Sequence, residues 1–156
     1  MANNNNNMKL CFDTCVLIDF FGKTDNFENT LIAIDVAIIN GFEICCTASS
    51  TTDIVYLMHN RGFRSTNAEA RAIIEKLFNL FTIISNSEAD VKMAYNSKMT
   101  DYEDALIAYS ANRANVNFII TNKEKDFKFS PVPTLTPAKF IKLYTPADYS
   151  YEEFLA

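Results

Sequence analysis

The chain is poor in the residues that most often catalyse reactions without a metal ion. It contains one histidine, and its four cysteines include no Cys-x-x-Cys pair of the kind that holds structural zinc. No apolar run is long enough to cross a bilayer, and the first residues lack the basic and apolar parts of a signal peptide. We therefore expect a cytoplasmic protein with reduced thiols and no membrane partner.

Positive charge is also scarce. The chain has 14 Lys and Arg against 19 Asp and Glu, which gives a net charge of -5 at pH 7. Phosphate binding is mostly electrostatic, so this balance argues mildly against a nucleic-acid partner. The argument weakens if a cluster of carboxylates binds cations, because bound cations reverse the local field.

The 156 residues, 49% of them apolar, suit one globular domain with its own core. We find no internal repeat and no linker. We predict a disordered, Asn-rich lead-in over 1–7, a single domain over 8–143, and an acidic, aromatic tail over 144–156.

Short apolar runs alternate with helical patterns along this domain. The runs predict strands at 10–12, 42–47, 81–84, 118–121 and 132–135. Helical spacing and capping residues predict helices at 27–40, 50–58, 67–80, 88–96 and 101–114. Two of these helices follow the capping-box pattern, starting from Thr66 and Thr100. The alternation implies an α/β fold with a central parallel sheet of four to five strands flanked by helices.

Four aspartates stand near points where a strand should give way to a helix: Asp13, Asp53, Asp104 and Asp126. The ends of parallel strands meet at one edge of the sheet, so carboxylates far apart in sequence can share a pocket there. A group of carboxylates without a basic partner repels itself. A hard divalent cation such as Mg²⁺ or Mn²⁺ relieves that repulsion.

Each of these residues also has an ordinary structural explanation. Asp13 could cap the turn after its strand. Asp53, in a predicted first turn, and the pair Asp101 and Asp104 could complement a helix dipole. Asp126 could end a loop, and the hydroxyls of Thr14 and Thr121 could be caps as readily as groups that orient a water molecule.

Taken together, the motifs resemble those of a PIN domain. The matching segments begin at Asp13 (Asp-Thr-Cys-Val-Leu-Ile), Asp53 (Asp-Ile-Val-Tyr-Leu), Asp104 (Asp-Ala-Leu-Ile-Ala) and Thr121, and 133–140 resembles the closing strand and proline turn. The resemblance implies a three-layer PIN-like fold over about 8–143. Lys123 departs from the pattern, because it stands where the family usually has Asn or Asp. This either leaves a second metal position open to question or replaces a metal contact with a cation.

Many small members of that family are VapC-type toxins of toxin–antitoxin pairs. The resemblance therefore implies a Mg²⁺- or Mn²⁺-dependent endoribonuclease that cuts RNA, forms a homodimer and is inhibited by a cognate antitoxin. The implied metal ligands are Asp13, Asp53, Asp101, Asp104 and Asp126, of which all but Asp101 are also implied to be catalytic. The expected substrate contacts are Thr14, Thr121, Lys123 and Lys125.

Other readings of the acidic pattern remain. A phosphatase of the haloacid dehalogenase type would need an aspartate where Cys15 stands, and a receiver domain would need a phosphoacceptor aspartate in mid-chain. Neither explains the segment 104–108. The stronger alternative is a PIN-like module that binds RNA or protein without cutting. The apolar faces of 54–57 and 70–80 could form a groove for an antitoxin helix, or could belong to the core.

Overall fold

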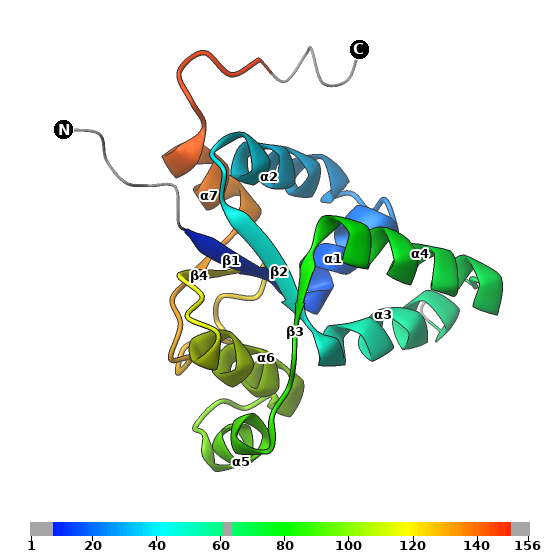
Figure 1. Cartoon of the computed structure of the whole chain (residues 1–156), viewed down its shortest axis with the longest axis vertical. Helices are drawn as coiled ribbons and strands as arrows, with labels where there is room; N and C mark the ends of the chain where they lie inside the picture. The colour runs from blue at the N-terminus through cyan, green and yellow to red at the C-terminus, as the bar shows by residue number, and fades with distance from the viewer. Residues whose placement is uncertain (1–7, 61–63, 151–156) are drawn as a thin grey trace.

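The computed structural model of the chain describes residues 8–60 and 64–150. Its centre is a parallel sheet with strand order β3-β2-β1-β4-β5 (Figure 1). The strands are β1 (Lys9–Phe12), β2 (Glu43–Thr47), β3 (Thr82–Ile84), β4 (Phe118–Ile120) and β5 (Thr134–Leu135). The predicted parallel sheet of four to five strands is confirmed, with strand ends shifted by one or two residues.

The middle strand, β1, pairs in parallel with β2 on one side and β4 on the other. Leu10, Cys11 and Phe12 are fully buried, as expected for a strand with helices on both faces. Because every strand pair is parallel, the carboxyl ends of the strands lie at one edge. The residue that follows β1 at this edge is Asp13.

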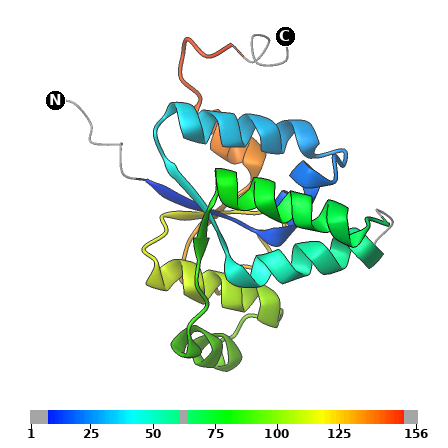
Figure 2. The same cartoon turned by 45° about the vertical axis from the view of Figure 1, so that its right-hand side comes forward.

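Helices cover both faces of the sheet and complete three layers (Figure 2). One core, containing Cys46 and Phe12, packs the sheet against α1 (Thr14–Phe21), α2 (Phe27–Ile39), α3 (Ala48–Asn60), α4 (Asn67–Leu80) and α7 (Pro137–Tyr144). The other core, containing Cys45 and Cys11, packs it against α5 (Glu88–Asn96) and α6 (Tyr102–Arg113). The adjacent cysteines thus point to opposite faces, and all four are free thiols.

Helix α6 lies against the sheet through a narrow face of alanines. Ala105, Ala108 and Ala111 are fully buried and share a core with Cys11 of β1 and Ile119 of β4. Their three-residue spacing places the three methyl groups on one side of the helix. This face brings the start of α6, and with it Asp104, to the carboxyl edge of the sheet.

The sequence prediction missed two helices. Helix α1 begins directly after Asp13, and helix α7 replaces the closing proline turn predicted at 133–140. Thr136 caps α7 by accepting a hydrogen bond from the Lys139 N–H at 3.1 Å, and Pro137 occupies the first turn. Proline costs no helical hydrogen bond at that position, so a Thr-Pro pair is a start signal that we overlooked.

The capping box predicted at Thr100 is wrong. Asp101 is the N-cap of α6, and its Oδ1 accepts the N–H of Asp104 at 3.0 Å. An aspartate one residue later offers an equally good acceptor, and the helix therefore starts at Tyr102. The box from Thr66 to Glu69 is confirmed with both of its hydrogen bonds.

The described part of the tail returns to the domain. The Tyr149 hydroxyl donates to Asp35 Oδ2 of α2 at 2.7 Å, and its ring packs against the core. The lead-in 1–7 and the residues 151–156 lie outside the described residues, and the predicted domain boundaries stay a prediction. No helix in 8–60 or 64–150 is both long and apolar enough to span a membrane.

Helix α7 offers a test of how the domain is held together. Phe140 is fully buried and packs edge-on against Phe42, with Tyr144 beside both rings. We expect Phe140→Ala to lower the free energy of unfolding by about 3–5 kcal/mol, because it leaves a cavity in the core. Urea denaturation measures this loss. Phe129→Ala, at a ring that is 51% exposed, is the control and should cost little. Equal losses in both variants would show that α7 adds no core packing.

Candidate active site

Asp13 is placed at the sheet edge by backbone hydrogen bonds. Its N–H donates to the Ile120 carbonyl of β4 at 3.0 Å, and its carbonyl accepts the first N–H groups of α1, from Val16 and Leu17. The carboxylate makes no capping bond to α1. The capping explanation of Asp13 is therefore wrong, and its side chain is available for another role.

The two carboxylate oxygens of Asp13 differ in their hydrogen bonds. Oδ2 accepts hydrogen bonds from Thr121 Oγ1 at 2.8 Å and from the Cys15 thiol at 3.0 Å. Oδ1 is buried and has no hydrogen-bond partner among the described residues. An unpaired buried oxygen on a charged group is costly, at roughly 1–3 kcal/mol or more. One oxygen of Asp13 is thus fixed in place, and the other lacks a partner.

Asp104 is 3% exposed and lies in the first turn of α6. The Lys123 ammonium donates to both of its carboxylate oxygens, each at 3.1 Å. The pKa of Asp104 is raised to about 6, first by burial and then by the charge of Asp13, with Lys123 opposing the rise. Asp104 and Asp13 therefore lie close enough to repel each other.

Asp53 is half-buried on α3. That helix begins at Ala48 and not at Ser50, so Asp53 lies beyond the first turn, which contains no acidic residue. The helix-dipole explanation is therefore wrong for Asp53. The pKa of Asp53 is raised to about 6, first by burial and then by neighbouring negative charges. The carboxylates that add to this rise are Glu103, Asp101 and Asp13.

Lys123 sits among these acids. Burial disfavours its charged form, but the nearby charges of Asp13 and Asp104 raise the pKa of its ammonium well above the ordinary value. Its backbone N–H donates to Thr121 Oγ1 at 3.0 Å. Thr121 thus contacts both Asp13 and the Lys123 backbone. The predicted substrate contacts of Thr121 and Lys123 stay predictions.

A family model described as the PIN domain matches residues 9–125, which include all of the acidic residues just described. The chain belongs to the PIN domain family. A search of curated protein sequences finds no match.

Solved structures similar to this PIN domain come from bacterial complexes. VapBC2 from Rickettsia felis, bound to a DNA fragment from their promoter, is 18% identical with a TM-score of 0.63, over 83% of this chain and 98% of that chain. FitAcB from Neisseria gonorrhoeae is 16% identical with a TM-score of 0.64, over 83% and 98%. VapBC-1 from nontypeable Haemophilus influenzae is 16% identical with a TM-score of 0.59, over 85% and 100%. At these identities the likeness establishes the shared fold, and the predicted three-layer PIN-like fold is confirmed.

The remaining predicted residues of the PIN domain lie less centrally. Asp126 and Lys125 are exposed, and within the described part of the chain neither side chain forms a hydrogen bond or ion pair. Thr14 is buried, and its hydroxyl donates to Ser50 Oγ at 2.9 Å, which joins α1 to α3. Hydrogen bonds join Asp13 to Thr121 and Asp104 to Lys123, and Asp53 and Asp101 lie near enough for their charges to be felt. Asp101 is exposed, like Asp126 and Lys125, and its carboxylate caps α6.

Two residues near the site escaped the sequence prediction. Cys15, read only as a core thiol, hydrogen-bonds to Asp13, and burial raises its pKa well above the ordinary value so that it stays protonated. Glu103 belongs to the predicted capping box and to the family-like segment Asp101-Tyr-Glu, but it is not among the predicted site residues; its charge adds to the acidic group. The run Asp-Tyr-Glu-Asp at 101–104 was a usable signal, because Asp101, Glu103 and Asp104 crowd the start of one helix.

The donor set suits a hard divalent cation. Carboxylate oxygens are the ligands that Mg²⁺ and Mn²⁺ prefer, and Asp13 Oδ1 is a buried oxygen that lacks a partner. The mutual repulsion that raises the pKa of Asp53 is the repulsion that a cation would relieve. Within 8–60 and 64–150, no three acidic, histidine or cysteine side chains already enclose a position for an ion. The carboxylate oxygens thus suit Mg²⁺ or Mn²⁺, and binding such an ion would require the acidic side chains to move closer together.

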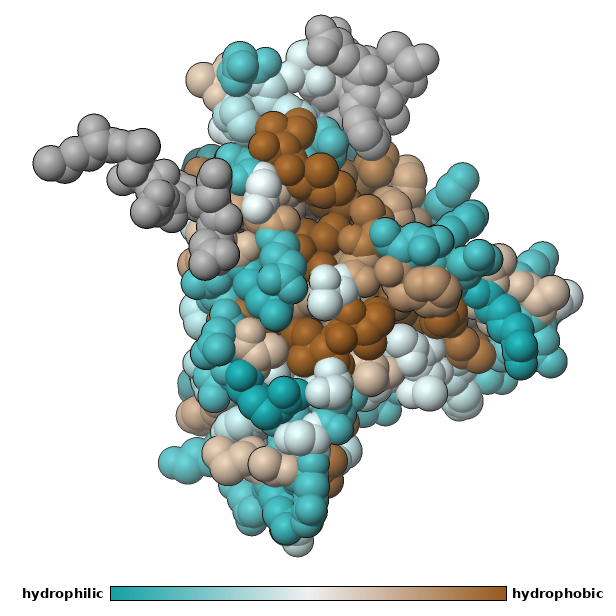
Figure 3. All heavy atoms as spheres, in the orientation of Figure 1, coloured by the Kyte–Doolittle hydropathy of each residue, from teal (hydrophilic) through white to brown (hydrophobic). Residues whose placement is uncertain are grey.

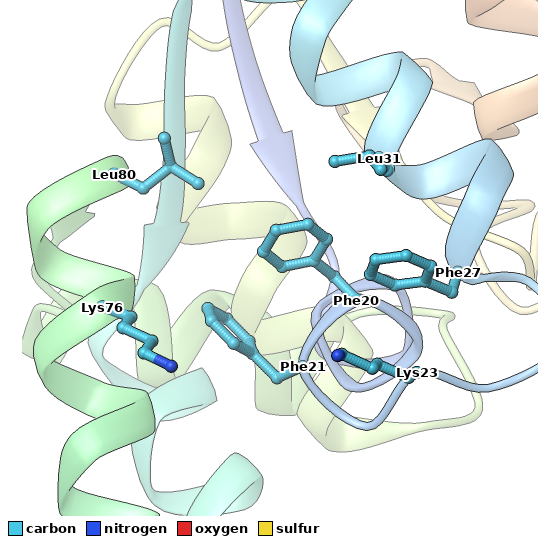
Figure 4. A pocket seen from close by; sticks show the side chains of 7 residues that line it. All are labelled: Phe20, Phe21, Lys23, Phe27, Leu31, Lys76 and Leu80. Carbon is cyan, nitrogen blue, oxygen red and sulfur yellow. The ribbon is translucent and has the colours of Figure 1, made fainter. Parts of the chain in front are cut away.

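An apolar pocket opens elsewhere on the PIN domain, between α1, α2 and α4. Figure 4 shows the rings of Phe20, Phe21 and Phe27 gathered on one side of it and Leu80 across from them. Lys23 and Lys76 also line the pocket. Figure 3 shows apolar side chains over the wider region between α2 and α4. The exposed apolar residues of these two helices include Ile38 and Ile39 of α2 and Leu80 of α4.

The groove predicted on 54–57 and 70–80 is divided between core and surface. Ile54, Ala70 and Leu77 are buried in the core. Val55, Tyr56 and Ile74 line a shallow pocket between α3 and α4, together with polar residues of α3. Ile54, Ala70 and Leu77 therefore belong to the core. Val55, Tyr56 and Ile74 leave an apolar surface that a partner could cover.

The raised pKa values predict a pH dependence of stability for the metal-free protein. Asp53 and Asp104 rise from their ordinary value of 3.8 to about 6, so the folded state holds their protons more tightly than the unfolded chain does. Their contribution to the free energy of unfolding therefore increases as pH falls from about 7 towards about 4, and is lost as pH rises through about 6. Urea midpoints measured across that range in chelator should rise towards acid.

Asp53→Asn should flatten this rise, because it removes one of the titrating groups. Asp25→Asn, at an exposed aspartate in the turn before α2, is the control and should keep the wild-type profile. A profile unchanged by Asp53→Asn would contradict the proximity of these carboxylates.

Proposed function

We propose that the chain is a Mg²⁺- or Mn²⁺-dependent endoribonuclease that hydrolyses RNA phosphodiester bonds, and the toxin of a toxin–antitoxin pair. The observation that carries this proposal is the buried, unpaired Oδ1 of Asp13 at the carboxyl edge of the sheet, beside Asp104 and Asp53. An oxygen in that state has a large free energy to gain from a cation. Membership of the PIN domain family supports the reaction class.

The residues of the chain divide the work. Asp13, Asp53 and Asp101 would hold the ion, with Asp126 entering from the surface loop after β4. Asp104 would hold the Lys123 ammonium beside it. When bound, the ion would neutralise phosphoryl charge and supply an activated water. Thr121 and Cys15 hold Oδ2 of Asp13 and so orient its carboxylate. The ammonium of Lys123 would contact a phosphate oxygen of the RNA, and Lys125, exposed nearby in sequence, would attract the RNA backbone.

Acidity of the chain does not oppose this role. The net charge is -5, but the site carries its own ammonium and would gain the charge of the metal. Those positive charges offset part of the negative charge of the carboxylates where the phosphate would bind. An RNA strand would meet this local charge as well as the net charge of the whole protein.

The antitoxin is proposed to cover the apolar pocket between α1, α2 and α4. Phe20, Phe27 and Leu31 would take apolar side chains, and Lys23 and Lys76 favour a partner segment that also carries carboxylates. The solved structures of similar fold are complexes, which agrees with a chain that leaves apolar surface for a partner. The predicted homodimer stays a prediction.

Two observations favour a second candidate function. The salt bridge from Lys123 to Asp104, together with the lack of three converging metal ligands in the described residues, would suit a PIN domain that binds RNA or protein without cutting. Metal binding separates the two functions, because only the nuclease depends on it.

Cleavage of RNA by the purified chain tests the proposal. We expect cleavage with Mn²⁺, none after chelation, and a loss of at least about 100-fold in Asp13→Asn, because even partners outside the first metal shell are worth about 10- to 100-fold. Asp104→Asn should behave in the same way, and Asp25→Asn should retain wild-type activity. Induced expression should arrest bacterial growth for the wild type and not for Asp13→Asn. Cleavage that survives both site substitutions would refute the nuclease assignment.

A further inference from the structure

Three consecutive residues after β4 each bond to an aspartate. The bonds run from Thr121 Oγ1 to Asp13 at 2.8 Å, from Asn122 Nδ2 to Asp19 at 2.8 Å, and from Lys123 Nζ to Asp104 at 3.1 Å. The Lys123 N–H also donates to the Thr121 hydroxyl. These bonds fix the backbone of Lys123 to the site. The position of the Lys123 ammonium therefore does not depend on its bond to Asp104 alone.

The ammonium of Lys123 lies where an ion chelated by Asp104 would lie. It is 3.1 Å from both carboxylate oxygens of Asp104, so it bridges them symmetrically. The Lys123 side chain is 40% exposed and that of Asp104 only 4% exposed, so water screens the pair incompletely. A divalent cation on the same two oxygens would face a positive charge at close range.

Asp13, unlike Asp104, forms no direct ion pair with the ammonium of Lys123. Its Oδ2 is occupied by the Thr121 hydroxyl and the Cys15 thiol, and its Oδ1 is buried with no partner in the described residues. No ion pair of the described residues reaches Asp13. The site therefore contains one aspartate paired directly with the ammonium of Lys123. The other, Asp13, meets that charge only at longer range and keeps one oxygen without a hydrogen-bond partner in the described residues.

We propose that Lys123 is the resident second cation of this site: it permanently neutralises Asp104, so that the site takes one divalent ion, through the unpaired oxygen of Asp13, and not two. This inference rests on the proposed metal-dependent nuclease and assigns its metal stoichiometry. In two-metal nucleases, paired ions clamp the attacking and leaving oxygens. Here the ammonium occupies one of the two positive positions, and it needs no metal from solution.

Calorimetric titration of Mn²⁺ into the full chain tests the stoichiometry. We expect one ion per chain for the wild type and two for Lys123→Ala, because removing the ammonium leaves Asp104 buried and unpaired. Lys125→Ala is the matched control: it removes the same charge two residues away at an exposed side chain without an ion pair in the described residues, and should bind one ion. Lys123→Arg keeps the positive charge and should also bind one.

Electron paramagnetic resonance of the Mn²⁺-loaded wild type gives a readout that depends on no variant. One ion per site should give the six-line spectrum of an isolated Mn²⁺. Two ions about 4 Å apart would couple and broaden it. This measurement decides the question even if Lys123→Ala fails to fold, since the wild type alone then distinguishes one ion from two.

The possible results distinguish a failure of the proposed role of Lys123 from a failure of the proposed nuclease function. Two ions in the wild type, or one ion in Lys123→Ala, would overturn the role of Lys123 while RNA cleavage could still stand. An ion bound by Lys123→Ala and none by the wild type would show that Lys123 blocks the site altogether, which also overturns it. No binding in any protein, with no RNA cleavage, would overturn the nuclease proposal together with this inference.

Discussion

Burial of the Asp13 carboxylate is the constraint on which the site depends. A charged group at the end of the central strand has little water to solvate it, so the surrounding residues must compensate. Thr121 and Cys15 do so for one oxygen. The other is left with neighbouring carboxylates that make its situation worse, as the raised pKa of Asp104 shows. A fold that keeps such an arrangement is stable enough elsewhere to bear its cost, as the two cores on either side of the sheet indicate.

Local patterns in the sequence predicted the sheet and most helices because they depend on short-range physics. Buried strands such as 10–12 read as apolar runs, and Thr66 with Glu69 marked the start of α4. The aspartates at the sheet edge followed from the same alternation. The sequence does not predict α1, because this helix begins inside the Asp13 motif. It does not predict α7, because Pro137 suits a turn as well as a helix start.

The chemistry of individual side chains was less accessible from the sequence. Asp101 and Thr100 are both good N-caps, and only the folded backbone decides between them. Asp126 follows the strand edge in sequence, yet its side chain faces solvent. The salt bridge from Lys123 to Asp104 joins residues 19 positions apart, and the bond from Thr121 to Asp13 spans 108. Pairings over such separations come from tertiary structure, which no local pattern encodes.

The buried alanines of α6 set how far this helix lies from the sheet, and so set a distance within the site. The distance of Asp104 from the strand that carries Asp13 is set by the methyl groups of Ala105, Ala108 and Ala111, all fully buried against the sheet. Any larger side chain at Ala108 would lift the helix by a fraction of an ångström, and interiors this close-packed transmit such shifts instead of absorbing them. The substitutions that the site can accept are thus limited by alanines that carry no charge and have no proposed contact with substrate.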